Sequence, residues 1–349
     1  MDFIDYMQAH GHQQLAVWTD AKAGVKAFIA IHDTTLGPAL GGTRIWPHPS
    51  DEAAIMDALR LSRAMTYKSA AAGLPLGGGK GLIVADPHKD KTEAMLRSYG
   101  RFVESLGGRY ITTEDVGATG QDMEWIAKET AHVVGLPQSA GGSGNPAVVT
   151  GFGVYQAMRA CAEDVWGSDS LEGRTIAMQG FGNVASSLAT HLIGAGARLV
   201  VTDIDPGARE RAAAIEGVRL VDPGAIYDVE CDVFAPCALG GVLNERSVAK
   251  LRCAIVCGAA NNQLATDDDD QRLAARGILY APDFIANAGG VINVYYEYTG
   301  NYQEAKAMEK AGHIYDTTKQ VIALSRERGI TTAEAADALA EARLAEARA

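Results

Sequence analysis

Two lysines, Lys68 and Lys80, stand on either side of a glycine-rich stretch and are the residues best suited to chemistry. The spacing is not that of a phosphate-binding loop, because Leu74 and Gly81 occupy the places that need Gly and Ser or Thr. A loop without chemical function is the alternative. A lysine among glycines has little side-chain cover, so partial desolvation would lower its pKa toward neutrality. One lysine could therefore hold a carboxylate while the other transfers protons.

Two acids supply further titratable groups. The run 109–113 predicts a strand, and Glu114 and Asp115 follow directly after it. Acids at the carboxyl end of a strand often face a ligand crevice, although a solvated loop is an equal alternative. The presence of the two lysines favours the crevice.

The lysines must be positioned by the elements around them. Apolar stretches within 14–31 predict a pair of strands. Ser50, with two acids behind it, predicts the start of a helix that would carry Lys68 near its C-terminal end.

The helix is expected to end at Gly73 and Pro75, which disfavour its continuation. The glycines would then form a turn that reverses the chain and directs Lys80 toward Lys68, and residues 81–85 would form a strand. The two lysines are thus expected to converge on one cleft.

The second half of the chain shows a dinucleotide-binding pattern. A short apolar run at 175–179 is followed at once by a GxGxxA motif and a helical stretch through His191. The first glycine permits a tight turn, the second lets backbone approach a pyrophosphate, and the alanine lets the helix pack on the strand. The free N–H groups of that helix would face the phosphates. The predicted cofactor contacts here are Gly180, Phe181, Gly182, Asn183, Val184 and Ala185.

The next predicted strand, 198–203, ends in Asp203, about 20 residues after the glycines. A carboxylate there would accept hydrogen bonds from the adenine ribose and repel a 2′-phosphate, which favours NAD. Arg198 and Arg209 keep NADP open as an alternative. Later apolar runs at 231–235, 253–257 and 278–281 would complete a parallel sheet.

The composition favours a small-molecule ligand. The chain has 349 residues, which suggests two domains, and its net charge of -12 argues against nucleic acid or an anionic membrane as the main partner. No segment approaches the roughly 20 apolar residues of a membrane span, and residues 1–5 lack the basic start of a secretory signal. A cytoplasmic protein is expected.

Metal and disulfide chemistry are not expected. The five cysteines form no CxxC pair, and the eight histidines form no HExxH motif. The acidic run 267–270 is expected to fill the first turn of a helix behind Thr266, where it favours the helix dipole. Thr331 and Glu334 form a capping-box pattern at the start of a C-terminal helix.

Several motifs in both halves, in the same order, resemble the glutamate/leucine/phenylalanine/valine dehydrogenases, and among them most of all the leucine dehydrogenases. The resemblance covers nearly the whole chain. It rests on the dinucleotide motif, the segment of the two lysines, and the runs Gly37–Arg44, Thr113–Gly117, Gly258–Asn262 and Asn287–Val291.

The resemblance implies an α/β protein with two domains and a cleft between them. Residues 1–138 would form a substrate-binding and oligomerisation domain, and 139–330 a Rossmann-type NAD-binding domain. The C-terminal helix, 331–349, would pack back on the first domain. The resemblance also implies a homo-oligomer, with an octamer as one form.

The resemblance further implies an NAD-dependent, reversible oxidative deamination of branched-chain L-amino acids, as in their catabolism. Lys68 would pair with the substrate carboxylate, helped by backbone at Gly41 and Gly42. Lys80 would be the catalytic lysine, and Asp115 would shuttle protons. Thr150 would contact the nicotinamide carboxamide, and either Asn261 or Asn262 would lie near the substrate and the nicotinamide ribose.

The substrate preference is also inferred from the resemblance. Leu40 stands where glutamate dehydrogenases carry a lysine for the distal carboxylate, so a glutamate side chain would lose its hydration without a partner. Val291 and Val294 would line the pocket, whose aliphatic wall suits leucine, valine and isoleucine. Thr113, where leucine dehydrogenases carry Ala, leaves leucine versus valine open.

Other classes of protein are alternatives. A phenylalanine- or valine-preferring enzyme would share most of these motifs. A non-catalytic NAD-binding protein would have no need to keep both lysines and Asp115. An amine dehydrogenase has no substrate carboxylate for Lys68, and a hydroxy-acid dehydrogenase usually employs a His base.

Overall fold

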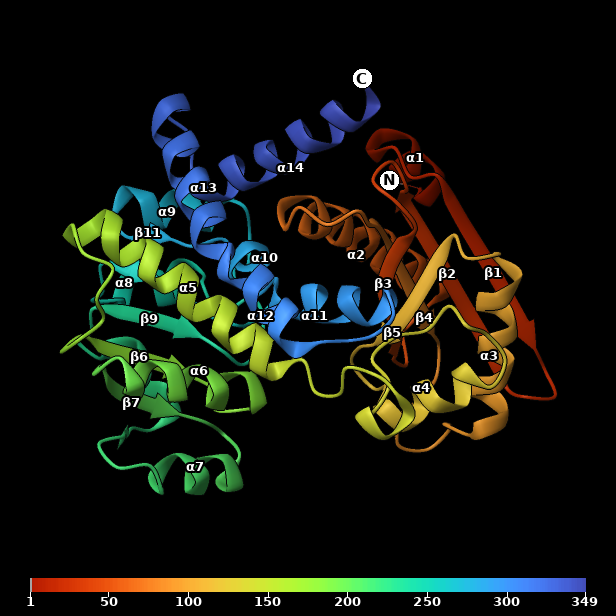
Figure 1. The fold of residues 1–349 in the computed structure, drawn as a ribbon, viewed down its shortest axis with the longest axis horizontal. Helices are drawn as coiled ribbons and strands as arrows, with labels where there is room; N and C mark the ends of the chain where they lie inside the picture. The colour runs from red at the N-terminus through yellow and green to blue at the C-terminus, as the bar shows by residue number, and fades with distance from the viewer. Residues whose placement is uncertain (1) are drawn as a thin grey trace. The chain divides into compact units, whose positions relative to one another are not determined.

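The computed structural model describes residues 2–349, which fold into two compact units (Figure 1). Unit 1 contains the chain up to Asn145 together with Val294–Gln303 and Ala340–Ala349. Unit 2 contains Pro146–Asn293 and Glu304–Leu339. The sequence placed the domain boundary after residue 138, whereas the chain passes into unit 2 after Asn145 and returns twice to unit 1.

Unit 1 is built on a five-stranded mixed sheet. Its order is β1-β2-β4-β3-β5. The predicted strand pair is confirmed, because β1 and β2 are antiparallel neighbours; β2 and β4 are also antiparallel, and β3 lies parallel to both β4 and β5. The strands span Gln14–Asp20 (β1), Val25–Asp33 (β2), Ala39–Ile45 (β3), Gly77–Ile83 (β4) and Tyr110–Glu114 (β5).

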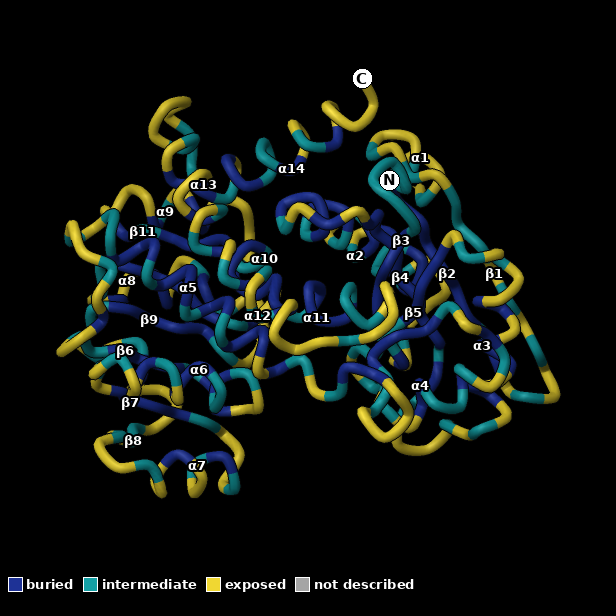
Figure 2. Tube along the Cα trace, in the orientation of Figure 1, coloured by how far each residue is buried: buried dark blue, intermediate teal, exposed yellow. Residues whose placement is uncertain are grey.

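Helices cover both faces of this sheet, so the inner strands β2 and β4 are almost entirely buried, whereas the edge strand β1 is partly exposed (Figure 2). Alternate residues of β2 point to opposite faces. Phe28 and Ala30 pack with residues of α2, and Ile29 and Ile31 belong to the core beside α3. The helices of unit 1 are α1 (Phe3–His10), α2 (Asp51–Ala71), α3 (Glu93–Ser105) and α4 (Gly120–Ala127), with a 3-10 turn at Gln138–Ala140.

The start and end of α2 confirm the sequence prediction. The Ser50 hydroxyl accepts a hydrogen bond from the N–H of Ala53 and caps the helix. The helix ends at Ala71, and Gly73 adopts a left-handed φ of 62°. Lys68 therefore lies in the last turn of α2, as expected.

The glycine turn before Lys80 was predicted wrongly. Residues 77–81 belong to β4, and Lys80 lies in the interior of that strand. The glycines are needed there because neighbours leave no room for a side chain: a Cβ at Gly79 would lie 2.6 Å from the Tyr110 ring, and one at Gly81 would lie 1.9 Å from the Tyr99 hydroxyl. The strand also ends at Ile83, earlier than the predicted residue 85.

Unit 2 is a parallel six-stranded sheet in the order β11-β10-β9-β6-β7-β8. Numbered from β6, this is the strand order of a Rossmann fold. Each predicted strand of this half is present, although β10 and β11 are only two residues long. The strands span Thr175–Gln179 (β6), Arg198–Thr202 (β7), Arg219–Leu220 (β8), Val233–Pro236 (β9), Ile255–Val256 (β10) and Leu279–Tyr280 (β11).

Helices alternate with these strands, as the Rossmann pattern requires (Figure 1). They are α5 (Ala147–Trp166), α6 (Asn183–Gly194), α7 (Pro206–Ala213), α8 (Glu245–Lys250), α9 (Asp268–Ala275), α10 (Asp283–Ala286), α12 (Glu304–Gly312) and α13 (Ile314–Arg328), with a 3-10 turn at Pro223–Asp228. Two further helices, α11 (Gly289–Tyr298) and α14 (Thr332–Arg348), contribute residues to both units.

The C-terminal residues belong to unit 1 and contact the end of α2. Arg343 donates hydrogen bonds to the carbonyls of Ala70 and Ala71, and the Tyr67 hydroxyl donates to Glu341 at 2.8 Å. The predicted capping box at the start of α14 is confirmed, because the Thr331 and Glu334 side chains each bond the other's backbone N–H. None of the helices within residues 2–349 is long and apolar enough to cross a membrane.

Candidate functional site

Lys80 lies among glycines on the α2 face of the unit 1 sheet. The β-strand alternation puts Lys80 on the same face as Leu82, which packs with residues of α2. The strand register places Leu40 opposite Gly78 and Gly42 opposite Thr113, so both Leu40 and Thr113 share that face. Three residues predicted to meet the substrate are thus gathered on one side of one sheet.

Lys80 and Asp115 form a close ion pair in this position. The Lys80 ammonium is 2.8 Å from Oδ2 of Asp115, and the two side chains are 5% and 24% exposed. Burial lowers the pKa of Lys80, and the neighbouring Arg44 charge lowers it further, while Asp115 opposes both. Burial alone would raise the pKa of Asp115, but Lys80 and Arg44 together hold it below its usual value. The pair combines a carboxylate and a lysine whose pKa values both lie below their usual values.

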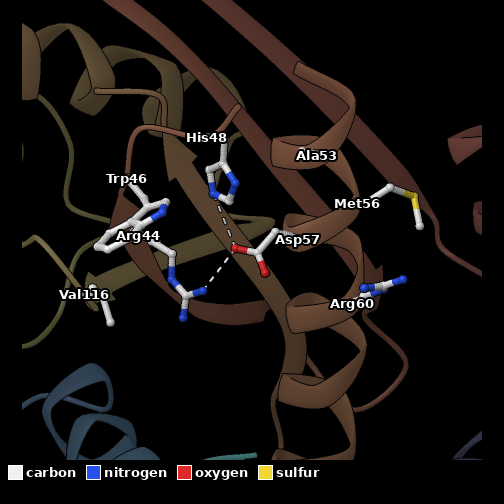
Figure 3. Close-up of a pocket in the computed structure, with 8 residues that line it drawn as sticks. All are labelled: Arg44, Trp46, His48, Ala53, Met56, Asp57, Arg60 and Val116. Atoms are coloured by element: carbon white, nitrogen blue, oxygen red, sulfur yellow. Dashed lines mark hydrogen bonds and ion pairs between the residues drawn. The ribbon is translucent and has the colours of Figure 1, made fainter. Parts of the chain in front are cut away.

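Arg44 is a residue of this cluster to which the sequence assigned no role. Its Nε donates to Asp115 at 2.9 Å, and its Nη1 donates to Asp57 of α2 at 3.0 Å. His48 lies 3.5 Å from the same carboxylate of Asp57 (Figure 3). Arg44 ends the Gly37–Arg44 motif, and its position on the same strand face as Leu40 and Gly42 was the signal that could have identified it.

Three residues of this cluster, Arg44, His48 and Asp57, line an open pocket of about 530 Å³ beside the Lys80–Asp115 pair, which is not part of its lining. Figure 3 shows Arg44, His48 and Asp57 grouped on one side of it, with Arg60 on the neighbouring turn of α2. The pocket is lined by Arg44, Trp46, His48, Ala53, Met56, Asp57, Arg60 and Val116.

Gly41 and Gly42 have a packing role in addition to the predicted backbone contact. A Cβ on Gly41 would lie 1.7 Å from the carbonyl oxygen of Gly79, and one on Gly42 would lie 2.7 Å from Cβ of Asp115. The absence of a side chain at Gly42 therefore lets Asp115 approach the strand. Lys68 is half-buried on α2, whereas Leu40 and Val294 are buried and Thr113 is half-buried.

In unit 2 the glycine motif follows β6, as predicted. Gly180 has a left-handed φ of 101°, which only glycine adopts readily. No atom lies within 4 Å of where a Cβ of Gly182 would be, and no side chain caps α6, which begins at Asn183. Ala185 is buried against the rest of the unit. This loop fits a pyrophosphate, because open backbone N–H groups begin the helix.

Asp203 follows β7 and holds the glycine motif in place. Its carboxylate accepts hydrogen bonds from the backbone N–H of Phe181 at 2.6 Å and of Asp205 at 2.8 Å. Arg198 and Arg209, the residues that kept NADP open, donate to backbone carbonyls.

The two asparagines of the Gly258–Asn262 motif lie in a loop fixed by Asn287. The Asn287 amide donates to the carbonyl of Ala259 at 3.1 Å and to Oδ1 of Asn261 at 2.9 Å. Asn262 has a left-handed φ of 51°. The sequence did not assign this positioning role to Asn287.

Two further predicted residues lie on helices of unit 2. The Thr150 hydroxyl donates to the carbonyl of Pro146, the residue before α5, so its lone pairs can accept a hydrogen bond. Val291, on α11, is buried.

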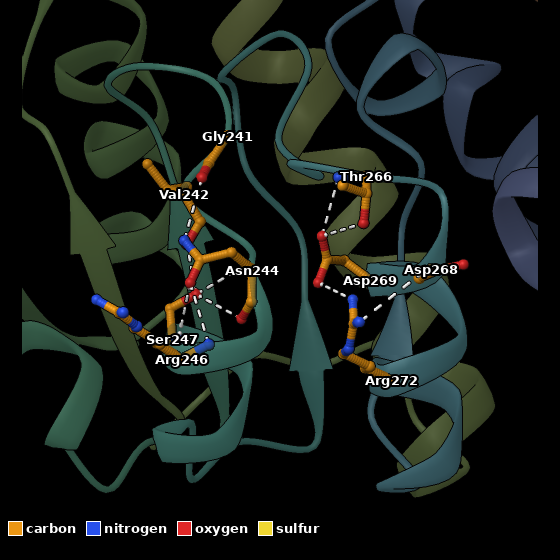
Figure 4. A network of polar contacts seen from close by, with 9 residues as sticks. All are labelled: Gly241, Val242, Asn244, Arg246, Ser247, Thr266, Asp268, Asp269 and Arg272. Atoms are coloured by element: carbon orange, nitrogen blue, oxygen red, sulfur yellow. Dashed lines mark hydrogen bonds and ion pairs between the residues drawn. The ribbon is translucent and has the colours of Figure 1, made fainter.

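The acidic run has the structural role expected of it (Figure 4). Asp268, Asp269 and Asp270 form the first turn of α9. Asp269 accepts hydrogen bonds from both the N–H and the hydroxyl of Thr266 and pairs with Arg272 at 2.7 Å. Figure 4 also shows Asn244 and Ser247 forming the equivalent cap of α8.

No cluster of His, Cys, Asp and Glu within the described part of the chain could hold a metal ion. All five cysteines are free thiols.

Two sequence models of one enzyme family match the chain. The model described as "Glu/Leu/Phe/Val dehydrogenase, dimerisation domain" matches residues 12–132. The model described as "Glutamate/Leucine/Phenylalanine/Valine dehydrogenase" matches residues 141–208 and 208–349.

Individual proteins match over nearly the full length. A leucine dehydrogenase of Thermoactinomyces intermedius is 51% identical, with 99% of this chain and 94% of the relative covered. A valine dehydrogenase of Streptomyces coelicolor is 49% identical over 97% of this chain and 93% of its own. The crystal structure of L-tryptophan dehydrogenase from Nostoc punctiforme superposes with a TM-score of 0.88 at 45% identity, covering 99% of both chains.

Proposed function

Since this chain belongs to the Glu/Leu/Phe/Val dehydrogenase family, it is an amino-acid dehydrogenase, and we propose that it is a leucine dehydrogenase that deaminates branched-chain L-amino acids reversibly with NAD. The observation that carries the proposal is the buried ion pair of Lys80 with Asp115, on the same sheet face as the apolar Leu40. The 51% identity to a leucine dehydrogenase over 99% of this chain supports the same proposal.

In the proposed reaction the residues of unit 1 bind the amino acid and move its protons. The Lys68 ammonium and the backbone at Gly41 and Gly42 hold the substrate carboxylate. Asp115 takes a proton from the substrate ammonium group, whose nitrogen keeps the electron pair. NAD, when bound, supplies the acceptor for the hydride that leaves Cα.

Lys80 then serves as the base for hydrolysis of the resulting imine. As a neutral amine it takes a proton from water while the water oxygen bonds to the imine carbon. Asp115 returns its proton to the nitrogen, and ammonia leaves with the electron pair of the C–N bond. The hydroxyl proton then passes to the Asp115 carboxylate as the C=O bond forms, and a 2-oxo acid remains. The lowered pKa of Lys80 supports this role, because the lysine must be neutral in one step and charged in the next.

The residues of unit 2 hold the cofactor in this proposal. The Gly180–Ala185 segment and the start of α6 would receive the pyrophosphate, and Asp203 the adenine ribose. Thr150 would receive the nicotinamide carboxamide, and Asn261 the nicotinamide ribose. Asn261, Asn262 and Val291 remain predicted substrate contacts.

The side-chain preference rests on the apolar character of the pocket residues. Leu40 and Val294 are buried and uncharged, so a glutamate side chain would lose hydration without gaining a partner. Two substrates that differ by one methylene group are discriminated by only about 1–3 kcal/mol of transition-state binding free energy. We therefore expect activity on leucine, valine and isoleucine, with Thr113 affecting their ratio.

Reductive amination of a panel of 2-oxo acids tests the function. Ammonium and NADH would be supplied with 4-methyl-2-oxopentanoate, 3-methyl-2-oxobutanoate, phenylpyruvate or 2-oxoglutarate, and NADH absorbance would be followed. The first two acids should have the highest kcat/KM. A preference for phenylpyruvate or 2-oxoglutarate would refute the pocket assignment, and no oxidation of NADH with any acid would refute the enzyme activity.

The match of residues 12–132 to a dimerisation domain indicates an oligomer. An octamer is the finer assembly we propose, following the resemblance to leucine dehydrogenases. A cytoplasmic location also belongs to the proposal, because the reaction draws on the NAD and ammonium of the cell interior.

A further inference from the structure

The two oxygens of the Asp115 carboxylate have very different surroundings. Both cations bind the same atom: Lys80 Nζ lies 2.8 Å and Arg44 Nε lies 2.9 Å from Oδ2. Oδ1 receives no hydrogen bond or ion pair from any residue that the structure describes. One oxygen is therefore anchored and the other remains available to a ligand.

Arg44 is held in place by a second carboxylate. Its Nη1 donates to Asp57 of α2 at 3.0 Å (Figure 3). Together with the Nε contact to Asp115, which follows β5, the planar guanidinium spans two acids from different parts of unit 1. His48 lies 3.5 Å from the Asp57 oxygen that Arg44 contacts. A guanidinium that uses two of its donors in this way has one orientation, which a lysine could not reproduce.

The charge of Arg44 acts on both members of the catalytic pair. An arginine stays protonated at any pH the enzyme meets. The charged groups that act on Lys80 are Asp115, Arg44 from β3 and Asp57 from α2. Of these, Arg44 favours the neutral lysine, and it also favours the ionised form of Asp115.

We propose that Arg44 is a positioning residue for the reaction: it anchors Oδ2 of Asp115 and thereby assigns Oδ1 as the oxygen that takes the proton from the substrate ammonium group. Asp57 in turn holds Arg44. The proposal rests on the proposed amino-acid dehydrogenase function. In the step itself an N–H bond of the substrate breaks, an O–H bond to Oδ1 forms, and the electron pair stays on nitrogen.

The pocket beside Arg44 permits a test by chemical rescue. Arg44→Ala removes a side chain that is 23% exposed and lines the open pocket, so a free guanidinium ion can reach the vacated position. Urea has a similar shape without the charge and serves as the matched reagent. Arg60→Ala is the matched variant, because Arg60 lines the same pocket and has no ion pair in the described structure.

We expect kcat for leucine deamination to fall about 100-fold in Arg44→Ala, as misplacement of a catalytic group commonly does, with a smaller change in KM. Guanidinium chloride, well below denaturing concentrations, should restore at least a tenth of the lost rate, and urea should not. The limb of the pH–rate profile that reports deprotonation of Lys80 should move to higher pH. Arg60→Ala should match the wild type.

Three results would overturn the proposal: a kcat for Arg44→Ala close to the wild-type value, an equal loss in Arg60→Ala, or equal rescue by urea. A wild type that turns over no amino acid would instead refute the proposed function. A second measurement does not depend on turnover. Lys80 is labelled with a small amine-reactive reagent at varied pH, and the extent of labelling is measured by peptide mass spectrometry. The apparent pKa of Lys80 should rise in Arg44→Ala alone, and an unchanged pKa there also contradicts the proposal.

Discussion

At the scale of single residues, the chemistry depends on taking Lys80 out of water. The side chain is 5% exposed, and the Asp115 carboxylate lies 2.8 Å from its ammonium group. Burial makes a protonated lysine costly, so its pKa falls, while the ion pair keeps the charged form accessible. A lysine on an exposed loop would remain charged through the reaction and could not act as the base.

Replacing Lys80 by methionine tests this role while keeping the length of the side chain. We expect kcat for leucine deamination to fall by at least about 100-fold, the usual worth of a general base. NADH binding, measured by fluorescence, should not change. Lys89→Met is the control, because Lys89 is 78% exposed and pairs only with Asp86. Turnover within tenfold of the wild type would contradict the catalytic role.

At the scale of elements, the position of Lys80 depends on a strand made mostly of glycines. β4 lies between β2 and β3 and is covered on both faces, so its glycines face helix and ring atoms directly. The Tyr99 hydroxyl beside Gly81 cannot move aside easily, because it accepts a hydrogen bond from Thr43 at 2.7 Å. Tight packing of this strand thus fixes the position of Lys80 within the sheet.

Gly81→Ala tests this packing. The new methyl group would lie 1.9 Å from the Tyr99 oxygen, and overpacking of this kind costs about 1–3 kcal/mol of unfolding free energy. The measurement is the midpoint of denaturant unfolding, together with kcat. Gly194→Ala in α6 is the control, because open space surrounds that position; it should leave stability unchanged or raise it by up to about 1 kcal/mol. Equal midpoints for the two variants would refute the packing account.

At the scale of the whole molecule, stability should depend on pH through buried histidines. His32 is buried in unit 1, where it bonds the Thr66 hydroxyl at 2.8 Å and the carbonyl of His10 at 2.9 Å. Burial, with a contribution from His12, lowers the pKa of His32 to about 4. The unfolded chain therefore binds more protons than the folded chain between pH 6.5 and 4, and stability falls as the pH drops through that range.

His32→Gln should reduce this acid sensitivity. The lowered pKa corresponds to about 3 kcal/mol of unfolding free energy, present above pH 6.5 and lost toward pH 4. Thermal unfolding midpoints measured across pH 4.5–7 should therefore decline less steeply in the variant than in the wild type. His88→Gln, at an exposed position, should decline like the wild type. Parallel declines in all three proteins would refute the contribution of His32.

Much of this protein is determined by its local sequence. The cap at Ser50, the end of α2 before Gly73 and the left-handed φ of Gly180 are local features that residue types and order indicate. Such features can be inferred from residue order, because a cap or a left-handed glycine requires only a few adjacent residues. The two lysines, Asp115 and the NAD-binding pattern were recognisable for the same reason.

Only the tertiary structure decided how these pieces meet. The run of glycines before Lys80 looked like a turn, because glycine is common in turns. It is a strand because it pairs with β2 and β3, and the rings of Tyr99 and Tyr110 leave no room there for larger side chains. The clustering of Arg44 with Asp57 and Asp115 depends on strand register and on the face that α2 covers. Contacts between residues distant in sequence follow from packing, and packing is a property of the whole unit that no short stretch of sequence encodes by itself.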